Sequence, residues 1–587
     1  TCNPRLARQA GELLGREARA RGFNVLCGGG MNLVRDPRCG RNFEYLSEDP
    51  WLSAVIAAEA VIGTQDQRVV AMLKHVSLNA SETNKFWLDA VIDPAAHRES
   101  DLLAFQIAIE RARPGALMCA YNKLNGEHCS GSAALIDGAV KGAFGFQGWV
   151  MSDWRSVYGW EAALSGLDQH SGAQLDEREW FNEPLRTAYA EGSLPRERLS
   201  DMVRRILRSI YDVGADQPAD GAAVDLQAHH AVALEVARQG IVLLHNEGAL
   251  PLAADVTSVA VIGGHADIGV LAGGGSSQVI PPGGYAATVP VGGQGPLGPL
   301  RVEGYDRSSP LAELRRLLPG ASVEYDSGVH PADAAALASR FEVAIVFATK
   351  FESEGFDSPD LSLGAGQDAT IEAVAAANPR TIVVLETGNP VSMPWLDRVP
   401  AVVQAWYPGQ AGGQAIAEVL TGVVNPSGRL PITFPADLSQ TPRPELPGFG
   451  TPYGSPLTIE YEEGAEVGYR WLARTGATPL FAFGHGLGYT RFAYDDLVIG
   501  GGETITASFT VTNDGARAGA DVPQVYLTEV AGEPRLRLLG FERVELAPGE
   551  SRRVTVTADP RLLATFDAGA GQWRIEDGGH RIALARS

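Results

Sequence analysis

The sequence predicts a multidomain α/β protein that ends in an all-β domain. The chain of 587 residues is too long for a single hydrophobic core. Short apolar runs alternate with amphipathic helical stretches as far as about residue 445, which is typical of repeated βα units. Beyond about residue 492 the helical periodicity stops, and apolar and polar residues alternate as in a β-sandwich.

Residues 1–211 are predicted to form a barrel-like domain. Four apolar runs, at residues 23–26, 69–73, 116–120 and 148–151, each lead into a polar cluster. In a parallel barrel the carboxyl ends of the strands share one face, where a site can be built from several strands. Because the region is shorter than the roughly 250 residues of a complete eight-stranded barrel, we expect the first strands to lie upstream of Thr1.

A second α/β domain is predicted over residues 229–445, after a Gly- and Ala-rich linker at 212–228. Its strands are predicted from four short, β-branched and continuously apolar runs, as expected for strands buried on both faces of a parallel sheet. These runs lie at residues 259–262, 343–347, 381–385 and 401–405.

Residues 446–491 are predicted to connect this domain to the β-sandwich at 492–587. Within the sandwich, Ala507, Phe509 and Val511 alternate with Ser and Thr, and the sequence after Val511 reaches an Asn-Asp-Gly turn. The alternation predicts a strand with one buried face.

Composition excludes several classes of function. Asp and Glu number 70 against 48 Lys and Arg, which gives a net charge of −22 and argues against nucleic-acid binding. No run of about 18 apolar residues occurs, so we expect no membrane span. The five cysteines lack CxxC spacing, so we expect no metal site.

The cysteines form two close pairs, Cys27 with Cys39 and Cys119 with Cys129. Short-range disulfides in an exported protein are one interpretation, and buried free thiols are the alternative. We predict the Cys119–Cys129 bond first and the Cys27–Cys39 bond second.

Two acidic segments are candidates for chemistry. Asp153 follows the apolar run at 148–151 and precedes Trp154, an arrangement suited to attack on a sugar ring; an ordinary helix N-cap is the alternative. Residues 351–357 combine three acids with two aromatics and a glycine on a loop. Such a loop can supply a carboxyl with a raised pKa, and a solvated acidic loop is the alternative.

Together these segments resemble the family 3 glycoside hydrolases, the β-glucosidase family, over essentially the whole chain. The resemblance rests on residues 35–50, 74–75, 118–122, 150–154, 166–168, 352–357, 404–410, 467–470 and 483–489. It implies a (β/α)8-type barrel, an α/β sandwich and a C-terminal fibronectin type III-like domain, with a retaining, exo-acting mechanism.

The resemblance also implies roles for individual residues. Asp153 matches the nucleophile, and we expect it to be ionised beside Arg41 and Lys74. Glu354 matches the general acid/base, with Glu352 as the alternative. The residues implied in sugar binding are Arg41, Lys74, His75 and Tyr121, with Trp154 as a wall of the leaving-group subsite and Glu82 as a support of the Lys-His pair.

Two departures from the family pattern stand out. An earlier strand of the family carries an Asp for the outer hydroxyls of the sugar, and nothing here corresponds to it. Residues 169–172 replace the usual acidic-Pro ending, which we expect to reshape the leaving-group side.

We therefore expect an exo-β-glucosidase that removes terminal non-reducing β-D-glucosyl residues from small glucosides and oligosaccharides, without cofactor or metal. A β-xylosidase or another exo-glycosidase of the family is the alternative, and an inactive carbohydrate-binding relative is a distant one. A periplasmic or secreted location is expected, with no nucleic-acid or membrane partner, and a homodimer is left open.

Overall fold

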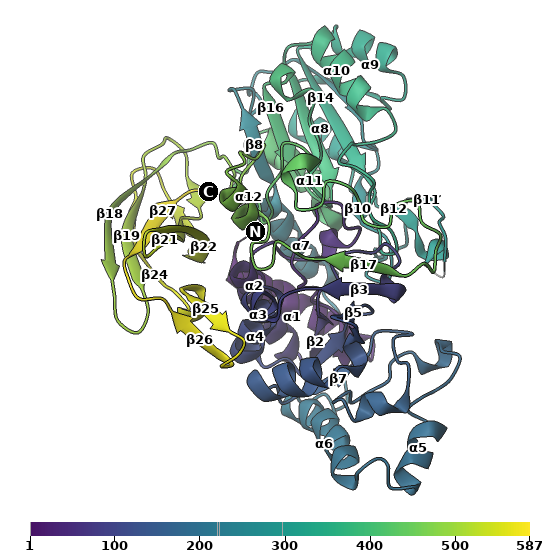
Figure 1. Cartoon of the computed structure of the whole chain (residues 1–587). Coiled ribbons are helices and arrows are strands. Elements are labelled where there is room, and N and C mark those ends of the chain that lie inside the picture. The colour runs from purple at the N-terminus through teal and green to yellow at the C-terminus, as the bar shows by residue number, and fades with distance from the viewer. Residues whose placement is uncertain (1, 220, 222, 296) are drawn as a thin grey trace.

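The computed structural model describes residues 2–219, 221, 223–295 and 297–587. Three regions follow one another along the chain (Figure 1): an α/β region in purple and blue, a second α/β region in teal and green, and a β-sandwich in yellow. The predicted fold class is thus confirmed. The predicted boundaries stay predictions, and residues 220 and 222 of the linker lie outside the described residues.

The first region contains a parallel sheet with the strand order β1-β2-β4-β7. Its strands are β1 (Val25–Leu26), β2 (Val70–Val76), β4 (Ala116–Cys119) and β7 (Trp149–Met151), at the four predicted places. Across the described residues these strands form an open sheet. Helices α1 (Pro4–Ala20), α2 (Pro50–Gln65), α4 (Asp101–Ala112) and α6 (Arg196–Asp212) accompany it.

Local sequence explains where two of these helices begin. Asn3 accepts a hydrogen bond from the N–H of Leu6, and Pro4 follows it as the first helical residue of α1. Asp49 caps α2 in the same way, with Pro50 next. An Asn or Asp cap followed by Pro satisfies one orphan N–H and removes another, which fixes the helix start.

The second region is a six-stranded sheet with the order β13-β9-β14-β15-β16-β8. The four predicted strands are β9 (Ser258–Gly263), β14 (Val343–Lys350), β15 (Thr381–Thr387) and β16 (Ala401–Gln404). The edges are β13 (Ser322–Asp326), which is parallel, and β8 (Val242–Asn246), which is antiparallel.

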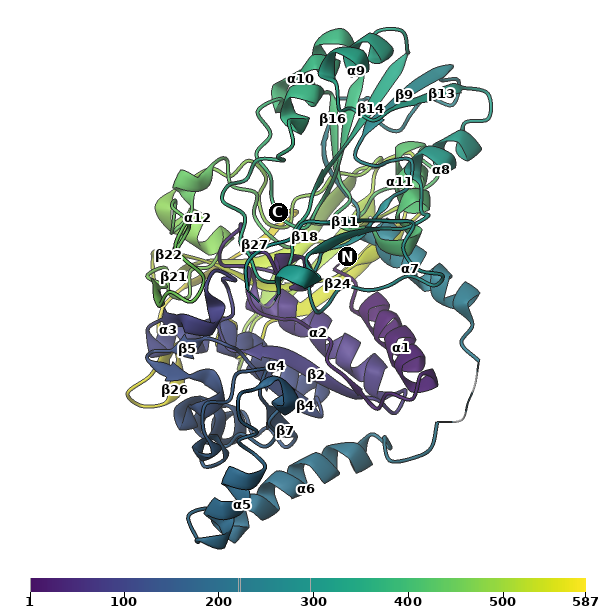
Figure 2. The same cartoon turned by 90° about the vertical axis from the view of Figure 1, so that its right-hand side faces the viewer.

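Alternate strand residues of this sheet face two separate cores. Val259 and Ile345 pack with helices α7 (Leu226–Gly240), α8 (Pro310–Leu317) and α11 (Gly412–Leu420). Ala260 and Val346 pack with α9 (Pro331–Ala338) and α10 (Gln367–Ala377) on the opposite face. Figure 2 shows α9 and α10 on one side of the sheet and α8 and α11 on the other, as the continuously apolar runs predicted.

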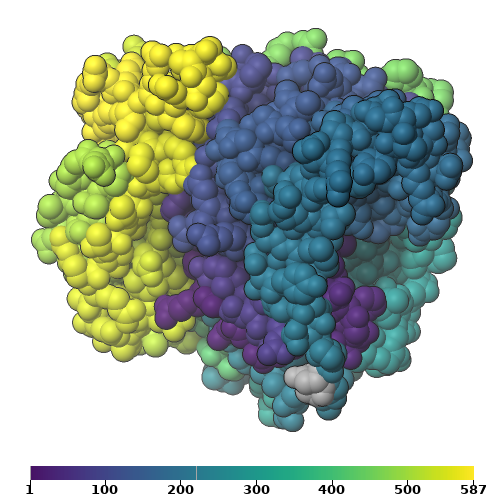
Figure 3. All heavy atoms as spheres, turned by 90° about the horizontal axis from the view of Figure 1, so that it is seen from below, coloured from purple at the N-terminus to yellow at the C-terminus, as the bar shows by residue number. Residues whose placement is uncertain are grey.

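The β-sandwich begins with β18 (Phe492–Gly500), β19 (Thr506–Asn513) and β24 (Ser551–Thr557). Ala507, Phe509 and Val511 are buried on β19 as predicted. A second sheet contains β21 (Gln524–Val530), β22 (Glu533–Phe541) and β27 (His580–Ala585). Figure 3 shows the sandwich packed against the first region.

The connecting segment takes part in the first region. Its strand β17 (Leu457–Glu460) pairs in parallel with β3 (Leu88–Val91), in the sheet β17-β3-β5-β6. Strands β5 (Lys123–Leu124) and β6 (Glu127–His128) form a short hairpin in the same sheet. A segment that follows the second region therefore completes a sheet of the first. No helix within the described ranges is long and apolar enough to cross a membrane.

The disulfide predictions are wrong for this structure. Cys2, Cys27, Cys39, Cys119 and Cys129 are all free cysteines. Cys27 is exposed whereas Cys39 is buried, and the Cys129 Sγ lies 3.7 Å from the carbonyl oxygen of Ser77. Burial raises the pKa of the Cys129 thiol to about 12. Closeness in sequence does not supply the specific geometry that a disulfide needs, and the alternative of buried thiols holds for Cys39, Cys119 and Cys129.

Candidate active site

The carboxyl ends of three neighbouring strands bring the predicted residues together. Lys74 and His75 lie near the end of β2, Tyr121 follows β4, and Asp153 follows β7. All four side chains are buried. Because β2, β4 and β7 are adjacent and parallel, residues separated by many positions in sequence meet at one edge of the sheet.

Asp153 is the centre of this cluster. Its Oδ2 lies 3.5 Å from the Nε2 of His75, its Oδ1 accepts a hydrogen bond of 2.8 Å from the N–H of Trp154, and the Tyr121 hydroxyl interacts with the same carboxylate. Burial raises the pKa of Asp153 above its ordinary value, against the lowering effect of Arg41 and Lys85. Arg41 favours the charged form as expected, and Lys85 acts in the place expected of Lys74. The ionisation of Asp153 at neutral pH stays a prediction.

Arg41 and Lys74 share one carboxylate. Glu44 forms an ion pair with the Nε of Arg41, and its Oε2 lies 3.7 Å from the Nζ of Lys74. Within the described part of the chain, the buried Nη1 and Nη2 of Arg41 and the Nδ1 of His75 make no hydrogen bond. Buried guanidinium groups without hydrogen-bond partners are rare in folded proteins, so Arg41 is suited to bind oxygen acceptors of a ligand. Burial lowers the pKa of His75 well below its ordinary value, so its neutral ring offers one nitrogen as a donor and the other as an acceptor.

The predicted acidic loop belongs to the second region and docks on the first through Asp357. The Asp357 carboxylate accepts hydrogen bonds from five donors of the first region. These are Gly40 N, Ser81 Oγ, Glu82 N, Thr83 N and Thr83 Oγ1, at 2.7–3.1 Å. A Cβ on Gly40 would lie 1.9 Å from the carbonyl oxygen of Phe356, so only glycine permits this close approach.

The docked loop carries Glu354 to the edge where Asp153 lies. The Oε1 of Glu354 is 2.7 Å from the Nζ of Lys85 and 3.5 Å from the Nη1 of Arg41. Its Oε2 accepts hydrogen bonds from the N–H and the hydroxyl of Ser276, at 2.9 and 2.6 Å. Glu354 also raises the pKa of Asp153, so the two carboxylates are within electrostatic reach of one another.

Glu354 does not have the raised pKa expected from the sequence. Burial raises its pKa, but Lys85, Arg41 and Ser276 together hold it well below the ordinary value. The unliganded site therefore contains an ionised Glu354. Sequence reasoning missed Lys85; the available signal was its position three residues after Glu82, whose Oε2 lies 2.8 Å from the same ammonium.

Glu82 supports this loop. Besides Lys85, its carboxylate accepts a hydrogen bond of 2.8 Å from the N–H of Gly355. The predicted support of Lys74 and His75 is corrected accordingly, because among the described residues the Glu82 carboxylate contacts Lys85 of the first region and the N–H of Gly355 of the second. Glu82 and Lys85 thus hold the Glu354 segment at two points. Lys85 binds the Glu354 carboxylate, and Glu82 accepts from the N–H of Gly355.

The alternative acid, Glu352, lies in a different environment. Burial raises its pKa to about 8, and neither carboxylate oxygen makes a hydrogen bond with the described residues. A Cβ on Gly388 would lie 2.6 Å from the Oε2 of Glu352. The N–H of Glu352 donates a hydrogen bond to the hydroxyl of Tyr407. These contacts place Glu352 inside the second region, whereas Glu354 contacts residues of the first.

Trp154 is half-buried beside the segment that departs from the family pattern. A Cβ on Gly172 would lie 2.1 Å from the Cδ1 of the Trp154 indole, and Gly172 has a φ of +65°. The N–H of Ser171 donates to the hydroxyl of Ser152, which precedes Asp153. Residues 169–172 therefore set the position of the Trp154 side chain, consistent with their predicted place on the leaving-group side.

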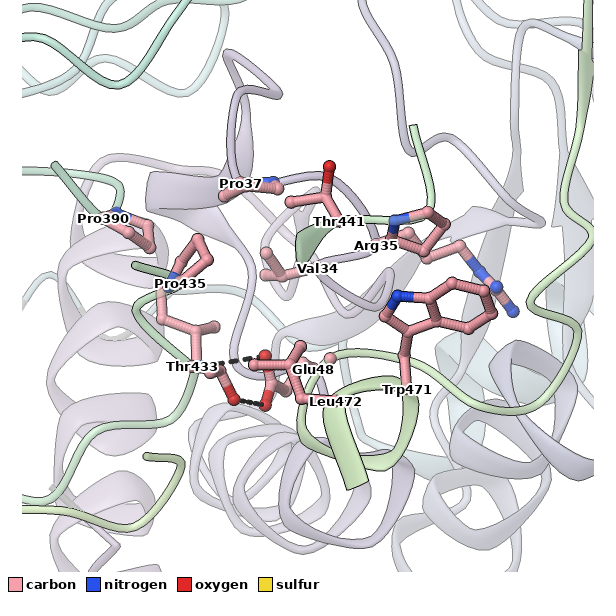
Figure 4. Close-up of a pocket in the computed structure, with 13 residues that line it drawn as sticks. Val34, Arg35, Pro37, Glu48, Pro390, Thr433, Pro435, Thr441, Trp471 and Leu472 are labelled. Carbon is pink, nitrogen blue, oxygen red and sulfur yellow. Dashed lines mark hydrogen bonds between the residues drawn. The ribbon is translucent and has the colours of Figure 1, made fainter. Parts of the chain in front are cut away.

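A separate small cavity of about 30 Å³ lies where the first region, the second region and the connecting segment meet (Figure 4). In it Glu48 accepts hydrogen bonds from the N–H and hydroxyl of Thr433, at 2.9 and 2.6 Å, and from the N–H of Tyr469. None of the predicted site residues lines this cavity. Glu48 joins parts of the chain that are distant in sequence, and the cavity is too small for a sugar.

No group of three or more His, Cys, Asp and Glu side chains suited to a metal ion is found among the described residues. The arrangement instead offers a buried carboxylate, a second carboxylate from another region, and cationic and hydroxyl donors around them. Paired carboxylates of this kind carry out nucleophilic and acid–base steps on acetals.

Comparisons with known proteins agree with this chemistry. The models of the N-terminal and C-terminal domains of glycosyl hydrolase family 3 match residues 1–209 and 241–489, and a fibronectin type III-like domain matches residues 521–587. Thermostable beta-glucosidase B of Acetivibrio thermocellus is 37% identical over 99% of this chain and 76% of the relative. The exo-alpha-(1->6)-L-arabinopyranosidase of Bifidobacterium breve is 31% identical over 100% of this chain and 76% of the relative.

Solved structures show the same architecture. DesR, a beta-glucosidase from Streptomyces venezuelae in complex with D-glucose, has a TM-score of 0.90 and 30% identity, and the match covers 100% of this chain and 89% of that one. Beta-glucosidase 3B from Thermotoga neapolitana, in complex with glucose, has a TM-score of 0.88 and 32% identity, with 100% and 85% covered.

Proposed function

Since the chain belongs to glycosyl hydrolase family 3, we propose that it is a retaining exo-β-glucosidase acting on terminal non-reducing β-D-glucosyl residues. The observation that carries the proposal is that buried polar atoms without hydrogen-bond partners surround Asp153. These atoms are the Nη1 and Nη2 of Arg41 and the Nδ1 of His75. A glucosyl ring presents hydroxyls to such a wall while its anomeric carbon faces the carboxylate.

The first step is attack by Asp153 on the anomeric carbon. A bond forms between the carboxylate oxygen and this carbon, the bond to the leaving oxygen breaks, and that oxygen takes a proton from Glu354. In the second step a water molecule gives a proton to Glu354 and displaces Asp153 from the same carbon. A separation of ~5–5.5 Å between the two carboxyl groups is predicted for such a retaining pair.

The first step requires protonated Glu354, whereas Lys85 and Arg41 favour its ionised form in the unliganded site. A bound sugar counteracts this preference for the ionised form. Sugar hydroxyls that accept hydrogen bonds from Arg41 draw this guanidinium away from Glu354, and the ring excludes water from the carboxyl. Both changes raise the pKa of Glu354. Substrate binding is thus proposed to prepare the acid.

Hydrolysis of aryl glycosides and trapping of the intermediate test the proposal. The protein should release nitrophenol from 4-nitrophenyl β-glucoside, and a 2-deoxy-2-fluoro glucoside should label Asp153 alone. The Asp153→Asn variant should keep the fold and lose turnover. A label on another acid would overturn the assignment of the nucleophile, and no hydrolysis of any aryl glycoside would favour an inactive binding protein.

The general acid has its own test. Glu354→Ala should slow glucosides with poor leaving groups far more than activated ones, and added azide should give a β-glucosyl azide because a small anion needs no general base. Glu352→Ala is the matched control, since its buried side chain contacts the second region. Azide rescue in Glu352→Ala alone would move the role to Glu352.

A pentose substrate is the second candidate. The similarity to an exo-alpha-(1->6)-L-arabinopyranosidase favours retaining it beside the β-xylosidase alternative, since related pockets accept sugars that differ at one carbon. Parallel measurement of kcat/KM on aryl β-glucoside, β-xyloside and α-L-arabinopyranoside decides between them. The largest kcat/KM for the aryl β-glucoside would support glucose as the preferred sugar.

A periplasmic or secreted location and a homodimer belong to the same proposal. Scavenging of oligosaccharides supports export of the protein. The cysteines do not support export, because all five are free. Fractionation of cells that express the full gene tests the location, and light scattering coupled to size exclusion tests the assembly.

A further inference from the structure

An aromatic pocket of about 320 Å³ lies beside the candidate active site. Four separate segments line it: Phe86 and Trp87 before β3, the β5–β6 hairpin with His128, the loop after β7 with Tyr158, and Tyr453 before β17. None of these side chains is used in the steps proposed above. The pocket volume is at the lower end of the range for small-molecule sites.

The pocket adjoins the acid side of the catalytic centre through Phe86. Phe86 follows Lys85, the partner of Glu354, and its ring centroid lies 4.6 Å from that of Tyr121. On the opposite side, Arg155 lines the pocket two residues after Asp153. Because the general acid acts on the leaving oxygen, a pocket beside Glu354 receives the leaving group.

The pocket walls are aromatic and accessible. His128 and Tyr158 are stacked with centroids 3.7 Å apart, and Trp87 and Tyr453 meet edge to face at 5.0 Å. Trp87, Tyr158 and Tyr453 are 39%, 47% and 42% exposed. Three large aromatic side chains kept accessible in one place mark a surface that binds planar or apolar groups.

Two cations face this aromatic surface. Lys123 and Arg155 line the pocket together with the aromatic rings. Burial lowers the pKa of His128 and raises those of Tyr158 and Tyr453, and the charges of Lys123 and Arg155 act on these same groups. Two acids lie nearby: Asp89, which is the strand partner of Lys123 and accepts the N–H of Gly126, and Asp176, which pairs with His170. Neither Lys123 nor Arg155 forms a salt bridge with the described residues, in a chain with a net charge of −22.

We propose that this pocket binds the leaving group and selects planar aromatic aglycones that carry a carboxylate. The aromatic ring of the aglycone lies between Tyr158 and Tyr453, and the carboxylate of the aglycone faces Arg155 and Lys123. The proposal rests on the proposed glucosidase function and deepens it by naming the aglycone class.

The test compares 3-carboxyphenyl and 3-methoxyphenyl β-glucosides, whose phenols leave with similar ease. The native protein should show kcat/KM about fivefold to tenfold larger for the carboxylate, as expected for one partly exposed ion pair beside an aromatic surface. Arg155→Gln should reduce this ratio towards one, and Lys123→Gln should reduce it in part. Arg186→Gln, an exposed arginine on α5 (Glu183–Ala190) outside the pocket, is the control and should keep the native ratio.

The inhibition constant of glucose reports the sugar subsite separately and should be the same in all these variants. Equal kcat/KM for the two glucosides in the native protein, or an unchanged ratio in Arg155→Gln, would overturn the proposed aglycone class while leaving the glucosidase function intact. A loss of cellobiose hydrolysis in Tyr158→Ala, with the aryl glucosides unaffected, would assign the pocket to a second sugar instead. Failure of the native protein to hydrolyse either glucoside would overturn the glucosidase function and, with it, this proposal.

Discussion

Asp357 is predicted to control catalysis without contacting the substrate, because it holds the loop that carries Glu354. The informative change is Asp357→Asn, which keeps the size of the side chain and replaces one carboxylate oxygen by an NH₂ group. In the native chain Oδ2 receives the hydroxyls of Ser81 and Thr83 and the N–H of Thr83, and Oδ1 receives the N–H of Gly40. Either orientation of the Asn amide leaves a backbone N–H facing another donor.

The structure gives a magnitude for this change. The hydroxyls of Ser81 and Thr83 can rotate and accept from the NH₂ group, whereas the backbone N–H groups cannot. One buried N–H left without an acceptor, together with the loss of charge-assisted bonds, costs about 3 kcal/mol. This is equivalent to about a 100-fold change in the equilibrium between docked and undocked loop.

Steady-state kinetics and thermal unfolding measure the effect. Asp357→Asn should lower kcat/KM for cellobiose at least tenfold, and lower it less for 2,4-dinitrophenyl β-glucoside, whose leaving group needs little protonation. Asp360→Asn is the matched control on the same loop, since its carboxylate accepts hydrogen bonds from the N–H and the hydroxyl of Ser362. Lys350 donates to the backbone carbonyl of Asp360, which the substitution keeps. Adding Asp357→Asn to Glu354→Ala should cost little more than Glu354→Ala alone. Independent, additive losses in the double variant, or native kinetics in Asp357→Asn, would refute the role of Asp357 in positioning Glu354.

Three further substitutions, at Lys85, Gly172 and Glu386, test other parts of the structure. Lys85→Gln should move the alkaline limb of the kcat/KM profile to higher pH, because it removes the cation that most strongly lowers the pKa of Glu354; an unmoved limb would contradict this. Gly172→Ala should reduce kcat/KM for aryl glucosides roughly 10- to 100-fold and leave glucose inhibition unchanged, since the new methyl displaces Trp154. Glu386→Gln should raise the free energy of unfolding at pH 7 by roughly 3 kcal/mol and have no effect near pH 4. Burial raises the pKa of Glu386 from 4.5 to about 8, so the folded chain keeps a proton that the unfolded chain releases, and stability falls as the pH rises between these values; denaturant titrations at both pH values check the sign.

The strands at the eight predicted places in the two α/β regions were predictable because each lies in a short apolar run whose neighbours in sequence are polar. Polar strands such as β13 and β17 were not predicted. The residues that follow β2, β4 and β7 were found for the same reason, since a strand end fixes where the next side chains lie. His75 and Asp153 therefore meet as expected, although they are far apart in the sequence.

Contacts between regions were not predictable from one sequence. Lys85 reaches Glu354 only because the second region docks on the first, and no local pattern encodes that docking. The pKa of Glu354 was misjudged for this reason: the loop sequence shows its own acids and aromatics, not the cations opposite. Cysteine spacing failed differently, because closeness along the chain does not determine where two sulfurs point.

The pairing of β17 with β3 has a consequence for biosynthesis. Strand β3 ends at Val91, but its partner is complete only at Glu460. On the ribosome, the first region is therefore synthesised long before this partner strand, and β3 presents an unpaired edge throughout the synthesis of the second region. Exposed strand edges pair readily with other chains, so a fragment that ends after the first region is expected to aggregate. The same delay applies to Tyr453, which reaches the aromatic pocket only when β17 takes its place.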